Sequence, residues 1–115
     1  MRIVHEPEGA ARPLATDVER AESMLQQSRG LMFRRSIPDD YGLVFPFDRV
    51  GRRSIHMLFV RFPIDVVWIA DEEVTKVETM SPWRSFGWAK ADTVLELPAG
   101  AAEGVAVGDT VVVES

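Results

Sequence analysis

The chain of 115 residues contains no cysteine. Disulfide bonds, thiolate nucleophiles, iron–sulfur clusters and zinc sites built on sulfur are therefore excluded. Histidine is nearly absent as well, with only His5 and His56 in the chain. Because no second histidine or carboxylate stands at ligand spacing from His56, we expect no metal site, and no motif predicts a bound cofactor.

Long hydrophobic runs are also missing. No stretch approaches the roughly 18 apolar residues that a membrane-spanning helix requires, and residues 1–7 lack the apolar core of a signal peptide. The sequence thus predicts a cytoplasmic protein without membrane contact. Its length and its 46% hydrophobic content favour a single domain over residues 1–115, which we expect to be a monomer.

The common catalytic and nucleotide-binding motifs are missing too. No Gly-x-Ser-x-Gly phrase marks a nucleophile elbow. Gly100, Gly104 and Gly108 recur every four residues but lack the preceding strand and following helix of a dinucleotide fingerprint. We therefore assign no catalytic residue and favour a protein that is not an enzyme.

The charge is unevenly distributed. The chain carries −5 overall, yet the segment Arg29–Arg61 holds seven arginines and three aspartates, a net +4. Such a basic patch can attract an anionic ligand, although arginines near turns often form only a solvated rim. The negative total argues against nucleic acid as a main partner.

A helix is predicted near the N-terminus. Residues 16–19, Thr-Asp-Val-Glu, have the form of a capping box. Val18 and Ala21 begin an apolar spacing typical of a helix, and Gly30 suits its C-terminal cap. These features predict a helix over about 16–29.

The rest of the chain has the pattern of short strands joined by turns. Residues 54–60 and 64–70 have apolar side chains at both odd-numbered and even-numbered positions, which is typical of strands buried on both faces. The whole pattern predicts an α+β fold, mainly antiparallel β, with a small barrel-like sheet and one N-terminal helix. The predicted strands are 2–5, 43–47, 54–60, 64–70, 74–80, 93–97 and 110–114, with a turn at 48–53 and a loop at 81–92.

Three acidic or basic side chains within strands are candidates for chemistry. Asp65 has only apolar neighbours, so it must be hydrogen-bonded or paired; it either anchors a ligand or, as we favour, ties a loop or turn in place. His56 is either a hydrogen-bonded structural residue or an acid/base group. Glu96 faces away from Leu95 and Leu97, which predicts a solvent-side residue or a partner of an arginine.

The loop Pro82–Trp88 contains three aromatic residues and an arginine. Such a loop either stacks on a sugar or other planar ligand or folds down over the end of the sheet.

We favour a non-catalytic domain that binds a small anionic or sugar-like ligand. A protein-interaction domain that uses exposed Phe and Trp is a second possibility, and an acid/base enzyme using Asp65 and His56 is a third. The candidate binding residues are Arg34, His56, Arg61, Asp65, Trp83 and Trp88.

An ordered set of phrases resembles a known family. The set comprises residues 29–34 (RGLMFR), 42–45 (GLVF), 62–66 (FPIDV) and 95–100 (LELPAG), together with Met57 and Gly108-Asp109. In this order they are similar to the domain of unknown function 192, over about residues 18–113. The resemblance implies a compact, mainly β domain with an N-terminal helix, and no established activity.

The chain departs from the common form of that family at one point. Many members carry a Lys-Asn pair after the methionine that corresponds to Met57, where this chain has Leu58 and Phe59. Any role of that polar pair is therefore not expected here. Many members also carry an export signal, which we do not expect in this chain.

Overall fold

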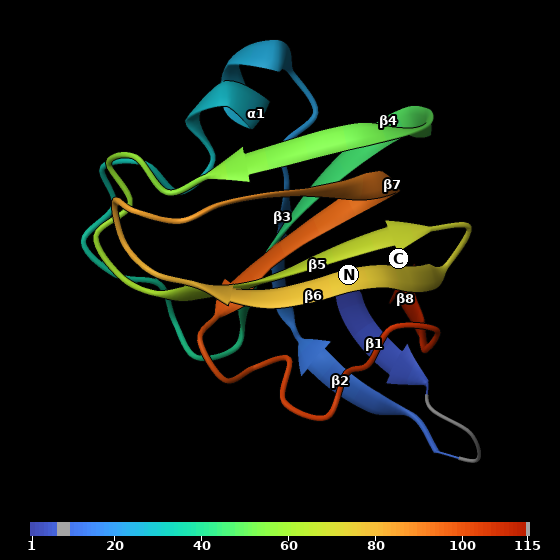
Figure 1. The fold of residues 1–115 in the computed structure, drawn as a ribbon. Helices are drawn as coiled ribbons and strands as arrows, with labels where there is room; N and C mark the ends of the chain where they lie inside the picture. Colours follow the sequence, from blue (N-terminus) through green and yellow to red (C-terminus); the bar gives the residue numbers. More distant parts are fainter. Residues whose placement is uncertain (7–9, 115) are drawn as a thin grey trace.

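The computed structural model describes residues 1–6 and 10–114, without the side chains of Met24, Leu25 and Ser28. Within these residues, eight strands form one sheet, and one helix of six residues stands above one end of it (Figure 1). The elements are β1 (Arg2–Glu6), β2 (Arg12–Ala15), β3 (Asp17–Arg20), α1 (Met24–Arg29), β4 (Tyr41–His56), β5 (Ile64–Ala70), β6 (Glu73–Met80), β7 (Phe86–Pro98) and β8 (Thr110–Glu114).

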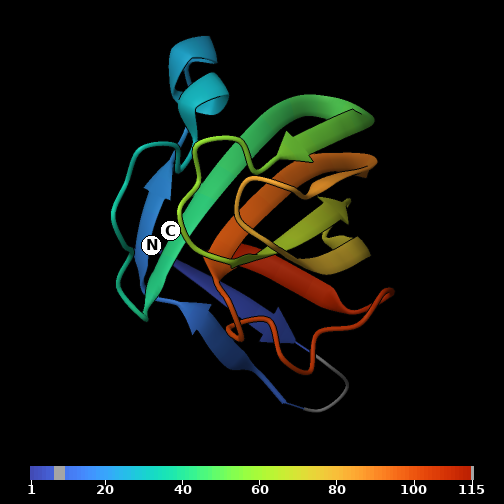
Figure 2. The same ribbon diagram turned by 60° about the vertical axis from the view of Figure 1, so that its left-hand side comes forward.

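The strands follow the order β2-β1-β8-β6-β5-β7-β4-β3. The β3–β4 pair is parallel, and the other pairs are antiparallel. β8 lies between β1 and β6, so the two ends of the chain meet in the sheet, as Figure 2 shows. The predicted barrel-like closure is wrong: β2 and β3 are free edges separated only by Thr16, and one residue is too short a connection for neighbouring strands to pair side by side.

The predicted α+β class with an N-terminal helix over 16–29 is also wrong. The fold is a β fold in which residues 17–20 pair with residues 41–44 along the edge of β4. Helix α1 spans six residues, and its true capping box joins Ser23 to Gln26. Short helices are marginal alone, whereas the edge of β4 offers the preceding segment a full ladder of backbone partners.

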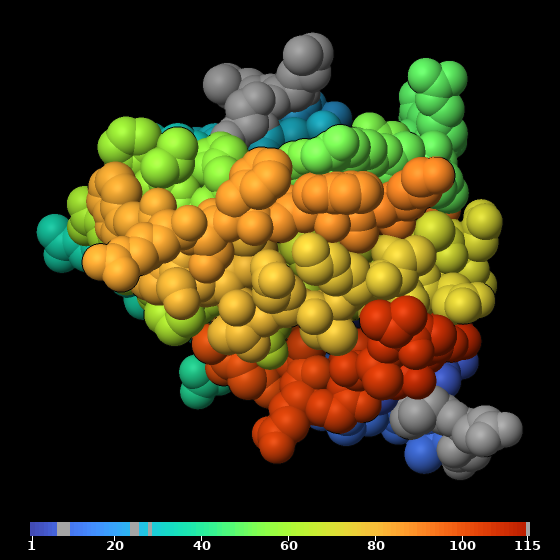
Figure 3. Space-filling view, viewed as in Figure 1, coloured from blue at the N-terminus to red at the C-terminus, as the bar shows by residue number. Residues whose placement is uncertain are grey.

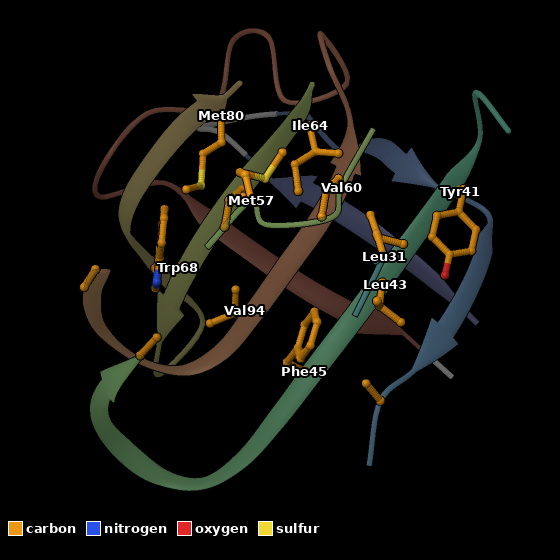
Figure 4. Packing of buried hydrophobic residues seen from close by; sticks show 14 residues of the cluster. Leu31, Tyr41, Leu43, Phe45, Met57, Val60, Ile64, Trp68, Met80 and Val94 are labelled. Carbon is orange, nitrogen blue, oxygen red and sulfur yellow. The ribbon is translucent and has the colours of Figure 1, made fainter. Parts of the chain in front are cut away.

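The central strands are buried on both faces, as predicted for residues 64–70. Ile64 and Trp68 point into a first core cluster, whereas Val67 and Ile69 point into a second. Figure 4 shows the first cluster, where Trp68, Met57 and Phe45 converge from different segments. In the space-filling view, the chain of β4, β7 and β6 forms successive bands over the interior (Figure 3).

Strand boundaries differ from the prediction at three places. β4 continues through the predicted turn at 48–53, where a register shift between Pro46 and Gly51 bends it against β7. Residues 57–60 leave the sheet, and β7 begins already at Phe86, inside the predicted loop. The charged residues of 48–53 and 90–92 are exposed or half-buried within long strands, a pattern that also resembles a loop.

Candidate functional site

Glu96 is the most unusual side chain of the molecule. It lies in β7, opposite Val66 of β5 and Leu43 of β4. The Glu96 side chain faces away from Leu95 and Leu97, as predicted. That face of β7 is covered by the first core cluster and not by solvent, so Glu96 is only 5% exposed. The prediction of a solvent-side residue is therefore wrong, because residues 94–97 of β7 are covered on both faces.

A cavity of about 180 Å³ lies over the Glu96 carboxyl group. Its wall comes from α1 and the following loop on one side and from β4 on the other. Gly30, with φ 49°, lets the loop approach: an added Cβ would lie 3.5 Å from Glu96 Oε1 and 3.4 Å from Phe45 Cζ. The remaining lining residues are Gln27, Arg29, Leu31, Met32, Ser54, Ile55, His56 and Val60.

The electrostatics of this cavity are dominated by burial. Burial raises the pKa of Glu96 to about 8, and the charge of Arg34 opposes this rise. Among the described residues, Glu96 Oε1 has no hydrogen-bond partner. The carboxyl group is thus mostly neutral at pH 7, and the charged groups that line the cavity with it are Arg29 and, when protonated, His56.

Arg34 lies beside the cavity and not in its wall. Its Nη1 is 3.3 Å from Glu19 Oε1, and its guanidinium lies 5.2 Å from the centre of the Tyr41 ring. Burial raises the pKa of the Tyr41 phenol above its usual range. Arg34 and Leu43 both line a second cavity of about 220 Å³, which shares Arg29 and Gly30 with the first.

His56 lines the Glu96 cavity from the end of β4. The residue is exposed, and its Nδ1 accepts a hydrogen bond of 3.2 Å from the backbone N–H of Leu58. Arg61 is exposed on the loop that follows. The buried histidine of the chain is His5, whose Nε2 lies 2.8 Å from Asp109 Oδ2.

Asp65 pairs with Leu97 and so faces the opposite side of the sheet from Glu96, and its carboxylate accepts three hydrogen bonds. Oδ1 accepts from the Thr79 hydroxyl at 2.7 Å, and Oδ2 accepts from the backbone N–H groups of Gly100 and Ala102 at 3.0 and 2.9 Å. These bonds agree with a carboxylate that ties a loop to β5. Asp65 and His56 line different cavities, which removes the geometric basis for an acid/base pair.

The two candidate tryptophans have different neighbours. Trp83 is half exposed and meets the Phe59 ring edge-to-face, with 5.1 Å between ring centres. Trp88 lies on β7, and the Arg52 guanidinium stands 4.2 Å from the centre of its ring. The six candidates predicted from the sequence therefore do not line one cavity, and of them His56 lines the cavity over Glu96.

Sequence reasoning missed Glu96 as the centre of a site. The signal was present, since the strand that contains Glu96 has apolar residues at both odd-numbered and even-numbered positions, as a strand buried on both faces does. The prediction nevertheless assigned the face that carries Glu96 to solvent.

Among residues 1–6 and 10–114, no group of three acidic or histidine side chains is arranged to hold a metal ion. In the same described part of the chain, none of the helical structure has the length and apolar content of a membrane span.

Comparison with known proteins identifies relatives in Thermococcus and Pyrococcus species. The chain is 31% identical to a UPF0127 protein of Thermococcus kodakarensis over 100 residues, covering 85% of this chain and 62% of that protein. It is 30% identical to a UPF0127 protein of Pyrococcus furiosus, covering 84% of each chain. The chain thus spans less than two thirds of the length of the first relative.

Solved structures share the fold. A Sinorhizobium meliloti protein described as a "putative transcription regulator" superposes with a TM-score of 0.85 at 26% identity, covering 96% of this chain and 91% of that one. A protein of unknown function from Novosphingobium aromaticivorans gives a TM-score of 0.87 at 22% identity, covering 98% and 84%. The family profile described as "Uncharacterized ACR, COG1430" matches residues 4–113, and the chain therefore belongs to the DUF192 family.

Proposed function

We propose that this domain binds a small ligand in the cavity over Glu96. One observation supports the proposal: a carboxyl group that is 5% exposed lines a cavity of about 180 Å³, and its buried Oε1 has no hydrogen-bond partner among the described residues. A buried polar atom without a partner costs about 1–3 kcal/mol, a cost that a bound hydrogen-bonding group removes. The small volume restricts the ligand to a few heavy atoms, below the size of most drug-like ligands.

The charges around the cavity favour a small anion, such as a carboxylate. Because burial keeps the Glu96 carboxyl largely neutral near pH 7, this group can donate its proton in a hydrogen bond to an anionic oxygen. Arg29 contributes a permanent positive charge to the wall, and Arg34 lies close enough to influence Glu96. A bound anion in turn favours the protonated form of Glu96.

A titration followed by protein NMR tests this proposal. Acetate, lactate, phosphate, a monosaccharide and methylammonium are added separately to the protein at pH 7. We expect the carboxylates to shift the amide signals of residues 29–32 and 54–56 together. We also expect their affinity to fall as the pH rises through about 8, because ionised Glu96 repels them.

Two variants sharpen the test. Glu96→Gln keeps the shape of the group but cannot ionise, so the pH dependence of binding should disappear. Glu73→Gln changes an exposed glutamate of β6 and should leave binding unchanged. Scattered or absent shifts across the whole panel would contradict the proposed site.

A further inference from the structure

Three exposed aromatic rings form a continuous cluster at one end of the sheet. The ring centres of Phe33 and Phe59 are 5.1 Å apart, and those of Phe59 and Trp83 are also 5.1 Å apart. The residues are 54%, 43% and 50% exposed, respectively. A contiguous exposed apolar patch of this kind marks an interaction site more often than scattered single side chains do.

Three separate loops build this cluster. The loops 30–37, 57–63 and 81–85 meet at one end of the molecule, as both ribbon views show (Figures 1 and 2). The Phe33 N–H donates to the Phe59 carbonyl at 2.9 Å, and the Trp83 N–H donates to the Met57 carbonyl at 2.9 Å. These backbone hydrogen bonds join the three loops that carry the rings and so keep the rings close to one another.

The backbone of all three aromatic residues is in an unfavourable conformation. Phe33, Phe59 and Trp83 have φ of 68°, 62° and 68°. Among the described residues, the other non-glycine positions with positive φ are Asp71 and Glu72, which form the β5–β6 hairpin turn. Bulky residues rarely adopt positive φ, and such strain concentrates where side chains serve binding. Packing alone does not account for it, since about half of each aromatic residue is exposed.

The segments 30–37, 57–63 and 81–85 contain four arginines and no acidic residue, so they carry +4 while the rest of the chain carries −9. The first loop continues through Asp39 and Asp40 to the start of β4, and the Asp40 carboxylate accepts a hydrogen bond from the Thr16 hydroxyl. Arg35, Arg61 and Arg84 are exposed next to the aromatic cluster in sequence. We call the three rings and these three arginines the aromatic–arginine face.

We propose that the aromatic–arginine face binds a short acidic peptide segment of another protein that carries an apolar side chain. Tryptophan and arginine are enriched at protein interfaces and at their energetic centres. The rings meet each other tilted and edge-to-face, which offers an apolar contact for one side chain and no set of parallel faces for stacked bases. A lipid surface or a long nucleic acid extends beyond the screening length of about 8 Å and so also meets the acidic remainder of the molecule.

Binding to defined synthetic peptides tests the proposal. The probes are short peptides in which glutamates flank a central leucine or phenylalanine. The comparison peptides carry serine in place of glutamate, or alanine in place of the apolar residue. We expect measurable affinity only for peptides with both features, weakening with added salt, and amide shifts confined to the three loops.

Variants of the aromatic residues separate binding from folding. Phe59→Gly and Trp83→Gly remove a ring but also relieve the positive φ, so the melting temperature should stay the same or rise. Peptide affinity should fall by about tenfold or more. Val107→Ala, which shortens an exposed apolar residue elsewhere, should change neither quantity.

Contrary outcomes are equally specific. No peptide binding, binding that does not need the glutamates, or binding retained in both glycine variants would each overturn the proposal. Preferential binding to phosphatidylglycerol vesicles or to single-stranded oligonucleotides, measured in parallel, would also overturn it. Glu96→Gln should leave peptide binding intact, so that this proposal and the small-ligand cavity fail or succeed separately.

Discussion

At the scale of single residues, two buried carboxyl groups have opposite environments. Asp65 accepts three hydrogen bonds, whereas Glu96 Oε1 has no partner among the described residues. A carboxylate that accepts several N–H and O–H bonds is stabilised in its charged form, whereas one without partners in an apolar core is not. The first arrangement is typical of a structural tie and the second of a site that awaits a ligand.

Replacing Glu96 should change how stability depends on pH. Burial raises the pKa of Glu96 from 4.5 to about 8, so the folded protein holds a proton that the unfolded chain releases. The free energy of unfolding therefore falls as the pH rises from about 5 to 8, by at most about 1.4 kcal/mol per pH unit from this group. Glu96→Gln should remove that slope in urea titrations. Equal slopes in the variant and the unaltered protein would contradict this prediction.

Replacing Asp65 should destabilise the protein at neutral pH. Asp65→Ala leaves the N–H groups of Gly100 and Ala102 without their acceptor. We expect a loss of about 3 kcal/mol in the free energy of unfolding. Thr79→Val removes one donor to the same carboxylate and should cost about 1 kcal/mol. A loss below that of Thr79→Val would show that the tie is dispensable.

At the scale of elements, β4 lies in close contact with β1 and β2 at Gly42. A Cβ added to Gly42 would lie 2.7 Å from Ile3 Cδ1 and 2.9 Å from Ala15 Cβ. No side chain fits there without a shift of β1 or β2. The absence of a side chain at this one position thus allows the β1–β2 hairpin to pack over β4.

A matched pair of glycine substitutions in β4 tests this packing. Gly42→Ala should lower the free energy of unfolding by about 1–3 kcal/mol, as overpacking of a core usually does. At Gly51, the nearest atom is the flexible end of Arg53 at 3.3 Å. Gly51→Ala should therefore have an effect within about 0.5 kcal/mol. Thermal unfolding of the two variants gives the comparison, and similar losses in both would refute the packing argument.

At the scale of the whole molecule, the buried His5 of β1 contacts Asp109, which lies in the turn before the last strand, β8. The pKa of Asp109 is lowered by the hydrogen bond from the Ala106 N–H and then by the bond with His5. A lowered acid pKa contributes stability above its unfolded value that is lost as the pH falls. In Asp109→Asn, the free energy of unfolding should therefore depend less steeply on pH in the acid range than in the unaltered protein, as measured by circular dichroism. An unchanged acid transition would contradict the prediction.

Much of the sheet was predictable from the sequence, and the environment of the site was not. The alternation in residues 64–70 correctly indicated a strand buried on both faces. Residues 17–20 were assigned to a helix because the local spacing of apolar residues does not reveal a strand partner that lies distant in the sequence. That partner is the edge of β4, more than twenty residues further along the chain. The alternation around Glu96 correctly indicated its face, but only the fold reveals that α1 and its following loop cover that face.

The position of β8 has a consequence for how the protein is made. β8 (Thr110–Glu114) is the strand that joins the β2–β1 hairpin to β6 and the remaining strands. During synthesis on the ribosome, the hairpin at the start of the chain has no neighbour in the sheet until these last residues emerge. The nascent chain therefore displays an unpaired strand edge from the synthesis of β1 until residues 110–114 emerge, a period in which a chaperone can engage it.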